Sequence, residues 1–111
     1  MQSTLSRPQV EVVHISGHLN GSNASALQGQ LNAAVAANPS IPLLIDMSQV
    51  ESLDSAGLMA FVSALSLAQQ LDRQLSLCSI APSVRIIFEL TQLDRVFRIF
   101  DNPAAFEGAL H

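Results

Sequence analysis

The sequence predicts an α/β domain with a mostly parallel mixed sheet of four to five strands and about four helices. Two observations lead to this prediction. Short apolar segments typical of strands alternate with longer segments of helical periodicity, and one apolar run is uninterrupted. An uninterrupted run suits a central parallel strand that is covered on both faces. The length of 111 residues fits a single domain, which we expect to span residues 1–111.

The first strands lie near the N-terminus. Val10 to Ile15 mixes alternation with β-branched residues and predicts a strand. Arg7-Pro8 is expected to turn the chain back from a short strand at about Ser3 to Ser6, so that these two strands pair antiparallel at one edge of the sheet. Residues 16–25 are rich in glycine, serine and asparagine, which predicts a loop that ends in helix caps.

A helix and the uninterrupted strand follow this loop. Apolar residues at three- and four-residue steps from Ala24 to Val35 predict one amphipathic helix, which Asn38-Pro39 ends. The uninterrupted strand comprises residues 41–47, and polar residues bound it. We therefore expect Asp46 to end this strand and to cap the next loop.

The second half of the chain continues the alternation of strands and helices. A helix begins at Ser55 and runs to about Leu71, and residues 74–80 alternate as the next strand. Pro82 begins a further helix, because proline is favoured in a first helical turn. The last two elements are a short strand in residues 95–100 and a terminal helix in residues 102–110.

The composition argues against several classes of function. Only 13% of the residues are charged, the net charge is −4, and the five basic residues are scattered arginines without any lysine. Binding to DNA, RNA or an anionic membrane surface needs clustered basic residues, and the chain also lacks the tryptophan and tyrosine that stack on bases. A protein or a small molecule is therefore the favoured partner.

The same composition predicts a cytoplasmic protein. A single cysteine, Cys78, excludes an internal disulfide framework and fits a reducing compartment. No apolar run approaches the length of a membrane span, so we expect no membrane insertion. The first residues lack the basic and apolar regions of a secretory signal.

The sequence predicts neither a metal site nor a catalytic site. His14, His18, His111 and Cys78 lack the paired ligand spacing of a structural zinc site. A nucleophilic Ser55 would need a base, and its surroundings are not a G-x-S-x-G elbow. Glycine-rich phosphate motifs are absent as well. We expect a protein that is not an enzyme and needs no cofactor.

The polar stretch before the helix at Ser55 is the candidate functional site. The loops that hold Asn20 and Ser55 both follow strands, so they should meet at the carboxyl edge of the sheet, where such folds bind ligands. On a helical wheel, the apolar face is expected to be core, and it contains Leu58, Phe61, Val62 and Leu65. The opposite face is uncharged and contains Ser55, Met59, Ser63, Ser66 and Gln70. An exposed methionine suits docking against a protein, although a lone apolar surface residue is common.

Ser55 has two interpretations. As a cap or first-turn residue, it would satisfy a free backbone N–H group and stabilise the helix by about 1 kcal/mol. As a switch, it would accept a phosphate of about −1.5 to −2 charge, which a helix N-terminus tolerates. The bulk of the phosphate, and the repulsion that it adds to that of Asp54, would then act on a bound partner. Local sequence alone favours the cap. Gly57 costs about 1 kcal/mol relative to alanine within a helix, which a close backbone approach would explain.

Residues 43–65 resemble the central signature of the STAS (sulfate transporter and anti-sigma factor antagonist) domain family, apolar-D-x-S-x-V-x-x-x-D-S-S/T/A-G. The residues that fall on this signature in register are Asp46, Ser48, Val50, Asp54, Ser55, Ala56 and Gly57. Residues 15–27 resemble the family's G-x-L-D loop and the helix after it. Residues 79–106 resemble its C-terminal half. The resemblance covers nearly the whole chain and implies a STAS-like fold.

In stand-alone bacterial members of this family, the serine after the aspartate is phosphorylated by a kinase that is also an anti-sigma factor. The resemblance therefore implies an anti-sigma factor antagonist that is phosphorylated at Ser55. The implied partners are an anti-sigma factor and serine kinase of the histidine-kinase-like ATPase type, and a serine phosphatase that restores Ser55. The residues expected to bind the partner are Asn20, Ser22, Asp54, Ser55, Ala56, Gly57, Met59 and Ser63.

Two positions depart from the family pattern, and a second hypothesis stays open. Asn20 replaces the loop aspartate, which keeps a hydrogen-bonding role but removes a charge. The helix end at Thr91-Gln92-Leu93 lacks the usual glycine, so a left-handed cap there would carry a modest penalty. The alternative function is a STAS-type binding subunit that is never phosphorylated, either a component of a lipid-transport complex or a nucleotide-sensing module.

Overall fold

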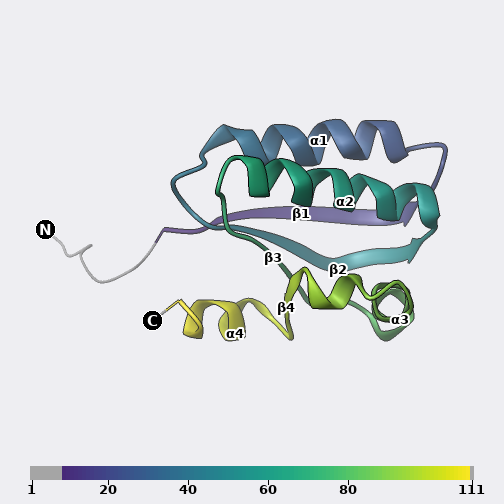
Figure 1. Ribbon diagram of the computed structural model, residues 1–111. Coiled ribbons are helices and arrows are strands. Elements are labelled where there is room, and N and C mark those ends of the chain that lie inside the picture. Colours follow the sequence, from purple (N-terminus) through teal and green to yellow (C-terminus); the bar gives the residue numbers. More distant parts are fainter. Residues whose placement is uncertain (1–8, 111) are drawn as a thin grey trace, which may run out of the picture.

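The computed structural model describes residues 9–110, in which strands and helices alternate (Figure 1). The elements are β1 (Glu11–Leu19), α1 (Ala24–Ala37), β2 (Leu43–Leu53), α2 (Ser55–Gln70), β3 (Leu75–Cys78), α3 (Pro82–Leu90), the short 3₁₀ helix η2 (Leu93–Arg95), β4 (Arg98–Phe100) and α4 (Pro103–Gly108). The predicted α/β class is confirmed. The strand predicted at Ser3 to Ser6, with its antiparallel pairing, lies outside the described residues. In residues 9–110, none of the helices combines the length and the hydropathy needed to cross a membrane.

The four described strands form one parallel sheet in the order β1-β2-β3-β4. The register places His14, Asp46, Cys78 and Phe100 in one row across it. Because all four strands point the same way, the loops that follow them meet at a single carboxyl edge of the sheet.

Strands β1 and β2 are longer than the sequence predicted. β1 continues to Leu19 instead of ending at Ile15, and β2 continues to Leu53 instead of ending at Met47. The prediction that Asp46 ends its strand and caps a loop is therefore wrong. Asp46 lies inside β2, where it pairs with neighbours on both sides.

Two β-bulges explain why this part of β2 was not predicted. β2 has one extra residue opposite the step from His14 to Ser16 of β1, and another opposite the step from Gly17 to His18. Each bulge shifts the alternation of side chains by one position. The second half of β2 therefore buries only Val50 and Leu53, and this spacing of three does not match the period of a regular strand.

Helices α1 and α2 lie side by side over one face of the sheet and cover the main core (Figure 1). Leu31, Val35 and Phe61 are fully buried there, as expected from the helical periodicity. Burial of side chains of this size contributes about 1.5–3 kcal/mol each. Phe88 joins α3 to this core, because its ring makes edge contacts with Phe61 at 6.2 Å and with Phe97 at 5.7 Å between centroids.

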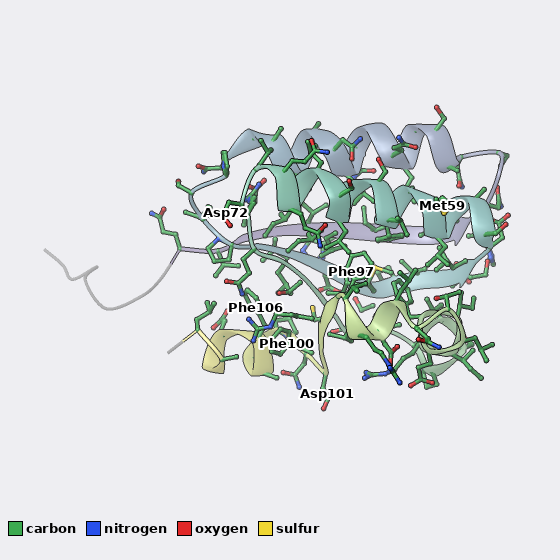
Figure 2. The ribbon with its side chains drawn as sticks, in the orientation of Figure 1. Met59, Asp72, Phe97, Phe100, Asp101 and Phe106 are labelled. Carbon is green, nitrogen blue, oxygen red and sulfur yellow. The ribbon has the colours of Figure 1, made fainter. Side chains whose placement is uncertain are left out.

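A smaller cluster lies under α4. It contains Leu44, Cys78 and Phe106, all of them buried. Phe100 of β4 packs edge-to-face on Phe106 at 5.4 Å between ring centroids (Figure 2). Cys78 is fully buried here, so the prediction that it is a small buried apolar residue is confirmed, and this burial raises the pKa of its thiol.

The turn after α3 contains the left-handed residue that the sequence suggested. Gln92 has a φ of 63°, a conformation that glycine adopts more easily. The hydroxyl of Thr91 donates a hydrogen bond to the carbonyl of Ile87 at 2.8 Å and so satisfies one end of the helix. The helix therefore ends with a left-handed residue although no glycine is present.

Arg73 forms a buried polar cluster that the sequence did not predict. Its side chain is completely buried and its Nη2 atom lies 2.8 Å from Oε1 of Glu11. The other guanidinium nitrogens donate to the carbonyls of Ala34 and Val35, at the end of α1, and of Ile41, before β2. A single side chain thus connects β1, α1 and the entry to β2.

Candidate functional site

The loop after β1 and the start of α2 meet at the carboxyl edge of the sheet. The backbone N–H of Asp54 donates to the carbonyl of Leu19 at 3.0 Å. The N–H of Gly21 donates to Oδ2 of Asp54 at 3.2 Å. These two bonds join the loop that contains Asn20 to the residue that precedes Ser55. The prediction that both loops lie at this edge is confirmed.

Asp54, and not Ser55, caps helix α2. Oδ1 of Asp54 accepts a hydrogen bond from the N–H of Gly57 at 2.9 Å. Ser55 is the first residue of the helix and is exposed. Within residues 9–110, its hydroxyl makes no hydrogen bond, so the interpretation of Ser55 as a capping residue is wrong. Because Ser55 is exposed, solvent or another molecule can reach its hydroxyl.

Gly57 is required by a close backbone approach. A Cβ atom at this position would lie 2.7 Å from the carbonyl oxygen of Leu19 and 2.9 Å from Cδ1 of Leu53. The side chain of Leu53 could move aside, but the backbone oxygen of Leu19 could not do so without a shift of the main chain. The absence of a side chain lets the first turn of α2 pack directly on the ends of β1 and β2, which holds Ser55 at the carboxyl edge.

We expect Gly57→Ala to lower the free energy of unfolding by about 1–3 kcal/mol, because the added methyl group must displace backbone atoms. The matched control is Gly29→Ala in α1, where a Cβ atom would meet nothing within 4 Å. That change should raise stability by about 0.5–1 kcal/mol, since alanine is the better helix former. Urea unfolding measures both. Equal effects of the two changes would contradict this role of Gly57.

The loop at Asn20 is held by its own side chains. Oδ1 of Asn20 accepts hydrogen bonds from the N–H of Ser22 at 2.9 Å and from its hydroxyl at 2.6 Å. The side chain of Asn23 accepts from the N–H of Asn20 at 2.9 Å and donates to the carbonyl of His18 at 2.7 Å. The amide oxygen of Asn20 therefore has the hydrogen-bonding role that was expected to survive the loss of the carboxylate.

The outer face of α2 matches the helical wheel except at one residue. Met59 is 59% exposed, and Ser66 and Gln70 are exposed as well. Figure 2 shows Met59 on the first turns of α2, at the end of the molecule where β1 and β2 finish. Ser63 is half-buried instead, because it faces α1, where its Oγ atom lies 3.4 Å from Nδ2 of Asn32. Its assignment to the exposed face is a correction.

The structure thus brings most of the predicted site residues together. Asn20, Ser22, Asp54, Ser55, Ala56 and Gly57 lie where the first loop meets the start of α2, and Met59 lies one turn further along the helix. Neither α1 nor α2 contains a charged residue. Asp54 is therefore the one negative charge directly beside Ser55 in the sequence.

A further polar group at the same edge was not predicted from the sequence. Nδ1 of His18 lies 2.7 Å from the hydroxyl of Ser52, and its Nε2 lies 3.9 Å from Oε1 of Glu51. His18 was expected in a loop, but the extension of β1 places it opposite Ser52. The bulges of β2 decide this pairing, so no sequence pattern could have predicted it. No group of three or more histidine, cysteine or acidic side chains within residues 9–110 is placed to hold a metal ion.

Asp46 lies inside β2, with His14 and Ser48 as its polar neighbours. Nδ1 of His14 lies 3.5 Å from its Oδ2, and the N–H of Ser48 donates to its Oδ1 at 2.9 Å. Burial alone would raise the pKa of this carboxyl. The hydrogen bonds from Ser48 and the nearby charge of His14 outweigh burial, so the pKa of Asp46 lies below its ordinary value.

We expect Asp46 to make stability depend on pH in the acid range. Because its pKa is lower in the folded state, the ionised carboxyl stabilises the fold above the ordinary pKa of aspartate, and this contribution is lost as pH falls through the lowered pKa. The difference in unfolding free energy between wild type and Asp46→Asn should be fully present at about pH 5 and should shrink below about pH 4. Urea unfolding across this range measures it, with the exposed Asp101→Asn as the control for a lost charge. An unchanged difference at acid pH would refute the prediction.

Comparison with known proteins shows one family over nearly the whole chain. A family model described as the STAS domain matches residues 3–105. The Bordetella bronchiseptica protein BtrV, a candidate anti-sigma factor antagonist, is 28% identical over 100 residues, which cover 86% of this chain and 85% of that protein. The crystal structure of an anti-sigma factor antagonist from Mycobacterium paratuberculosis matches with a TM-score of 0.76 and 30% identity, over 86% of this chain and 80% of the other.

A third similarity is more distant. The structure of the Bacillus cell fate determinant SpoIIAA in its phosphorylated form matches with a TM-score of 0.67, over 98% of this chain and 96% of that one. The two sequences are only 12% identical, so this similarity shows the fold alone.

Proposed function

Because this chain belongs to the STAS domain family, we propose that it is an anti-sigma factor antagonist controlled by phosphorylation of Ser55. The unphosphorylated form binds an anti-sigma factor that is also a serine kinase, and phosphorylation releases it. The observation that supports this most strongly is the exposed hydroxyl of Ser55, which has no hydrogen-bond partner in residues 9–110. The names of the relatives support the same class of partner.

The start of α2 is chemically suited to carry a phosphate. The N–H groups of Ser55 and Ala56 have no acceptor in the described part of the chain, and α2 has no acidic residue in its first turn. Free N–H groups and the helix dipole both favour a negative group at this end of a helix. The phosphorylated Bacillus structure has the same fold, which agrees with a modification that leaves the domain folded.

A phosphate on Ser55 would strongly weaken the binding of a partner docked on this surface. The phosphate would add about −1.5 to −2 charge beside Asp54, on a face of α2 that is otherwise uncharged. Met59 lies one helical turn from Ser55 and is exposed, so an interface that covers Met59 would also cover the phosphate. Bulk and repulsion would then act together at a buried position of the complex.

The proposed binding surface comprises the residues that the sequence predicted, with Ser63 at its half-buried margin. A serine phosphatase that removes the phosphate from Ser55 would reset the switch. We assign the protein to the cytoplasm, where the lone buried thiol of Cys78 stays reduced, and we infer that it acts by binding and not as an enzyme.

The test begins by capturing the kinase with Ser55→Ala, which should bind it without being modified. The captured kinase is then incubated with ATP and the wild-type chain, and mass spectrometry locates the phosphate. We expect modification at Ser55 and none in Ser55→Ala. Modification of a different serine, or a captured kinase that modifies neither form, would contradict the proposal.

The alternative of a nucleotide-sensing module receives less support. A hollow of about 210 Å³ lies between β1 and α1, with Ile15, Leu19 and Leu27 among the apolar residues that line it. Its polar lining is His14, Ser16, Asn23 and Gln30, and none of the arginines within residues 9–110 borders it. Nucleotide phosphates are usually held by arginine, lysine or glycine-rich loops, so this hollow is poorly suited to them.

A further inference from the structure

Asn20 and Gly21 form the one Asn-Gly pair among the 111 residues of the chain. An asparagine loses its side-chain amide most readily before glycine, because glycine has no Cβ atom to hinder attack by its own backbone nitrogen. The pair lies in the loop of the candidate site, where Gly21 is exposed and a Cβ atom on it would meet nothing within 4 Å. Water therefore has access to this pair.

The backbone nitrogen of Gly21 has a carboxylate at its proton. The N–H of Gly21 donates to Oδ2 of Asp54 at 3.2 Å, while Oδ1 of Asp54 accepts from the N–H of Gly57. A group within about 2.6–3.2 Å of the atom that holds a proton is close enough to act as its general base. Because the bond to Gly57 fixes the carboxylate at the start of α2, its second oxygen stays directed at Gly21.

The amide oxygen of Asn20 has two hydrogen-bond donors. The N–H of Ser22 donates to Oδ1 of Asn20 at 2.9 Å, and the hydroxyl of Ser22 donates to the same atom at 2.6 Å. When a nucleophile attacks the amide carbon, negative charge develops on this oxygen, and donors at about 2.7–3.1 Å stabilise it. The loop thus places a base at the nucleophile and two donors at the oxygen that receives the charge.

We propose that Asn20 is a site of self-catalysed deamidation, in which Asp54 and Ser22 assist the backbone nitrogen of Gly21. Asp54 takes the proton of the Gly21 N–H as that nitrogen bonds to Cγ of Asn20. The oxygen held by Ser22 carries the negative charge until the bond from Cγ to Nδ2 breaks, and the amine leaves as ammonia with the proton returned by Asp54. Water then opens the succinimide by breaking one of its two bonds to the Gly21 nitrogen, which leaves an aspartyl or an isoaspartyl residue.

The conversion adds a carboxylate to the loop that is bonded to the start of α2. The new charge lies near that of Asp54, on a surface whose helical part is otherwise uncharged. The aspartyl product also has the side chain that Asn20 replaces in the loop pattern. The effect of this charge on a partner rests on the proposed function, whereas the conversion itself does not and is measured on the pure chain.

The test incubates the purified full chain at neutral pH and follows each asparagine by peptide mass spectrometry, which detects the replacement of an amide by an acid. We expect Asn20 to convert faster than Asn23, and faster than Asn20 in a synthetic peptide of residues 16–25, which lacks Asp54. Asp54→Ser keeps a capping hydroxyl but removes the base, so conversion should be at least about 10-fold slower. Ser22→Ala removes one of the two donors and should also slow it at least about 10-fold.

The matched variant is Gly21→Ala, which adds a methyl group where there is open space. It should lower the rate at Asn20 to about that of Asn23, which also precedes alanine. Urea unfolding verifies that the variants are folded. Conversion that is no faster in the folded chain than in the peptide would overturn the proposal. So would conversion that is unchanged or faster in Asp54→Ser or in Ser22→Ala.

Discussion

Replacement of Ser55 by aspartate is expected to weaken binding to the anti-sigma factor partner at least 30-fold, about 2 kcal/mol. The change adds a carboxylate beside Asp54, on a face of α2 that is otherwise uncharged. The fold should be unaffected, because an acidic residue is favourable in the first turn of a helix. Isothermal titration with the captured partner measures the affinity, and thermal unfolding measures the stability.

The control for this prediction is Ser83→Asp. Ser83 is exposed in the first turn of α3, so the same substitution is made at a helix N-terminus away from the proposed site. We expect Ser83→Asp and Ser55→Ala to bind like the wild type. If Ser55→Asp also binds like the wild type, the chain is better described as a binding subunit that is never phosphorylated.

Replacement of Arg73 by methionine is expected to lower the free energy of unfolding by about 3–5 kcal/mol. The change removes four hydrogen bonds and leaves the carboxylate of Glu11 without its partner. It also leaves the carbonyls of Ala34 and Val35, at the end of α1, without these donors. A loss of this size is a large fraction of the stability of a small domain, which is about 5–15 kcal/mol. Urea unfolding monitored by circular dichroism measures it.

Two further variants test the partner of Arg73 and provide a matched control. Glu11→Gln keeps an oxygen that accepts a hydrogen bond and should lower stability by about 1 kcal/mol, because the side chain of Glu11 is partly exposed. Arg95→Met removes an exposed arginine and should change stability by less than about 0.5 kcal/mol. If Arg73→Met is no more destabilising than Arg95→Met, the buried cluster does not stabilise the fold.

The candidate site could be predicted because its signals are local. Asp54, Ser55 and Gly57 stand directly before an apolar helical pattern, and the parallel topology brings their loop to the same edge as Asn20. The wheel placed Met59 outward because the apolar residues of α2 define its buried face. These inferences need only the helical period and the alternation of strands with helices.

Three features required the tertiary structure. The lengths of β1 and β2 depend on bulges, which break the period on which strand prediction relies. The capping role belongs to Asp54 and not to Ser55, because Asp54 can bond both Gly57 and the loop of Gly21. Arg73 gave no signal, since its four acceptors lie more than 30 residues away in the chain.

The sequence by itself determined the order of the elements, the buried faces of the helices and the position of Ser55 at a helix start. Each of these follows from interactions within a few residues along the chain. The tertiary structure alone decided that Ser55 is exposed with no hydrogen bond from its hydroxyl within residues 9–110, that Gly57 lies close to the backbone of Leu19, and that Ser63 faces α1. These depend on contacts between residues distant in sequence, whose distances are set only when the helices pack on the sheet.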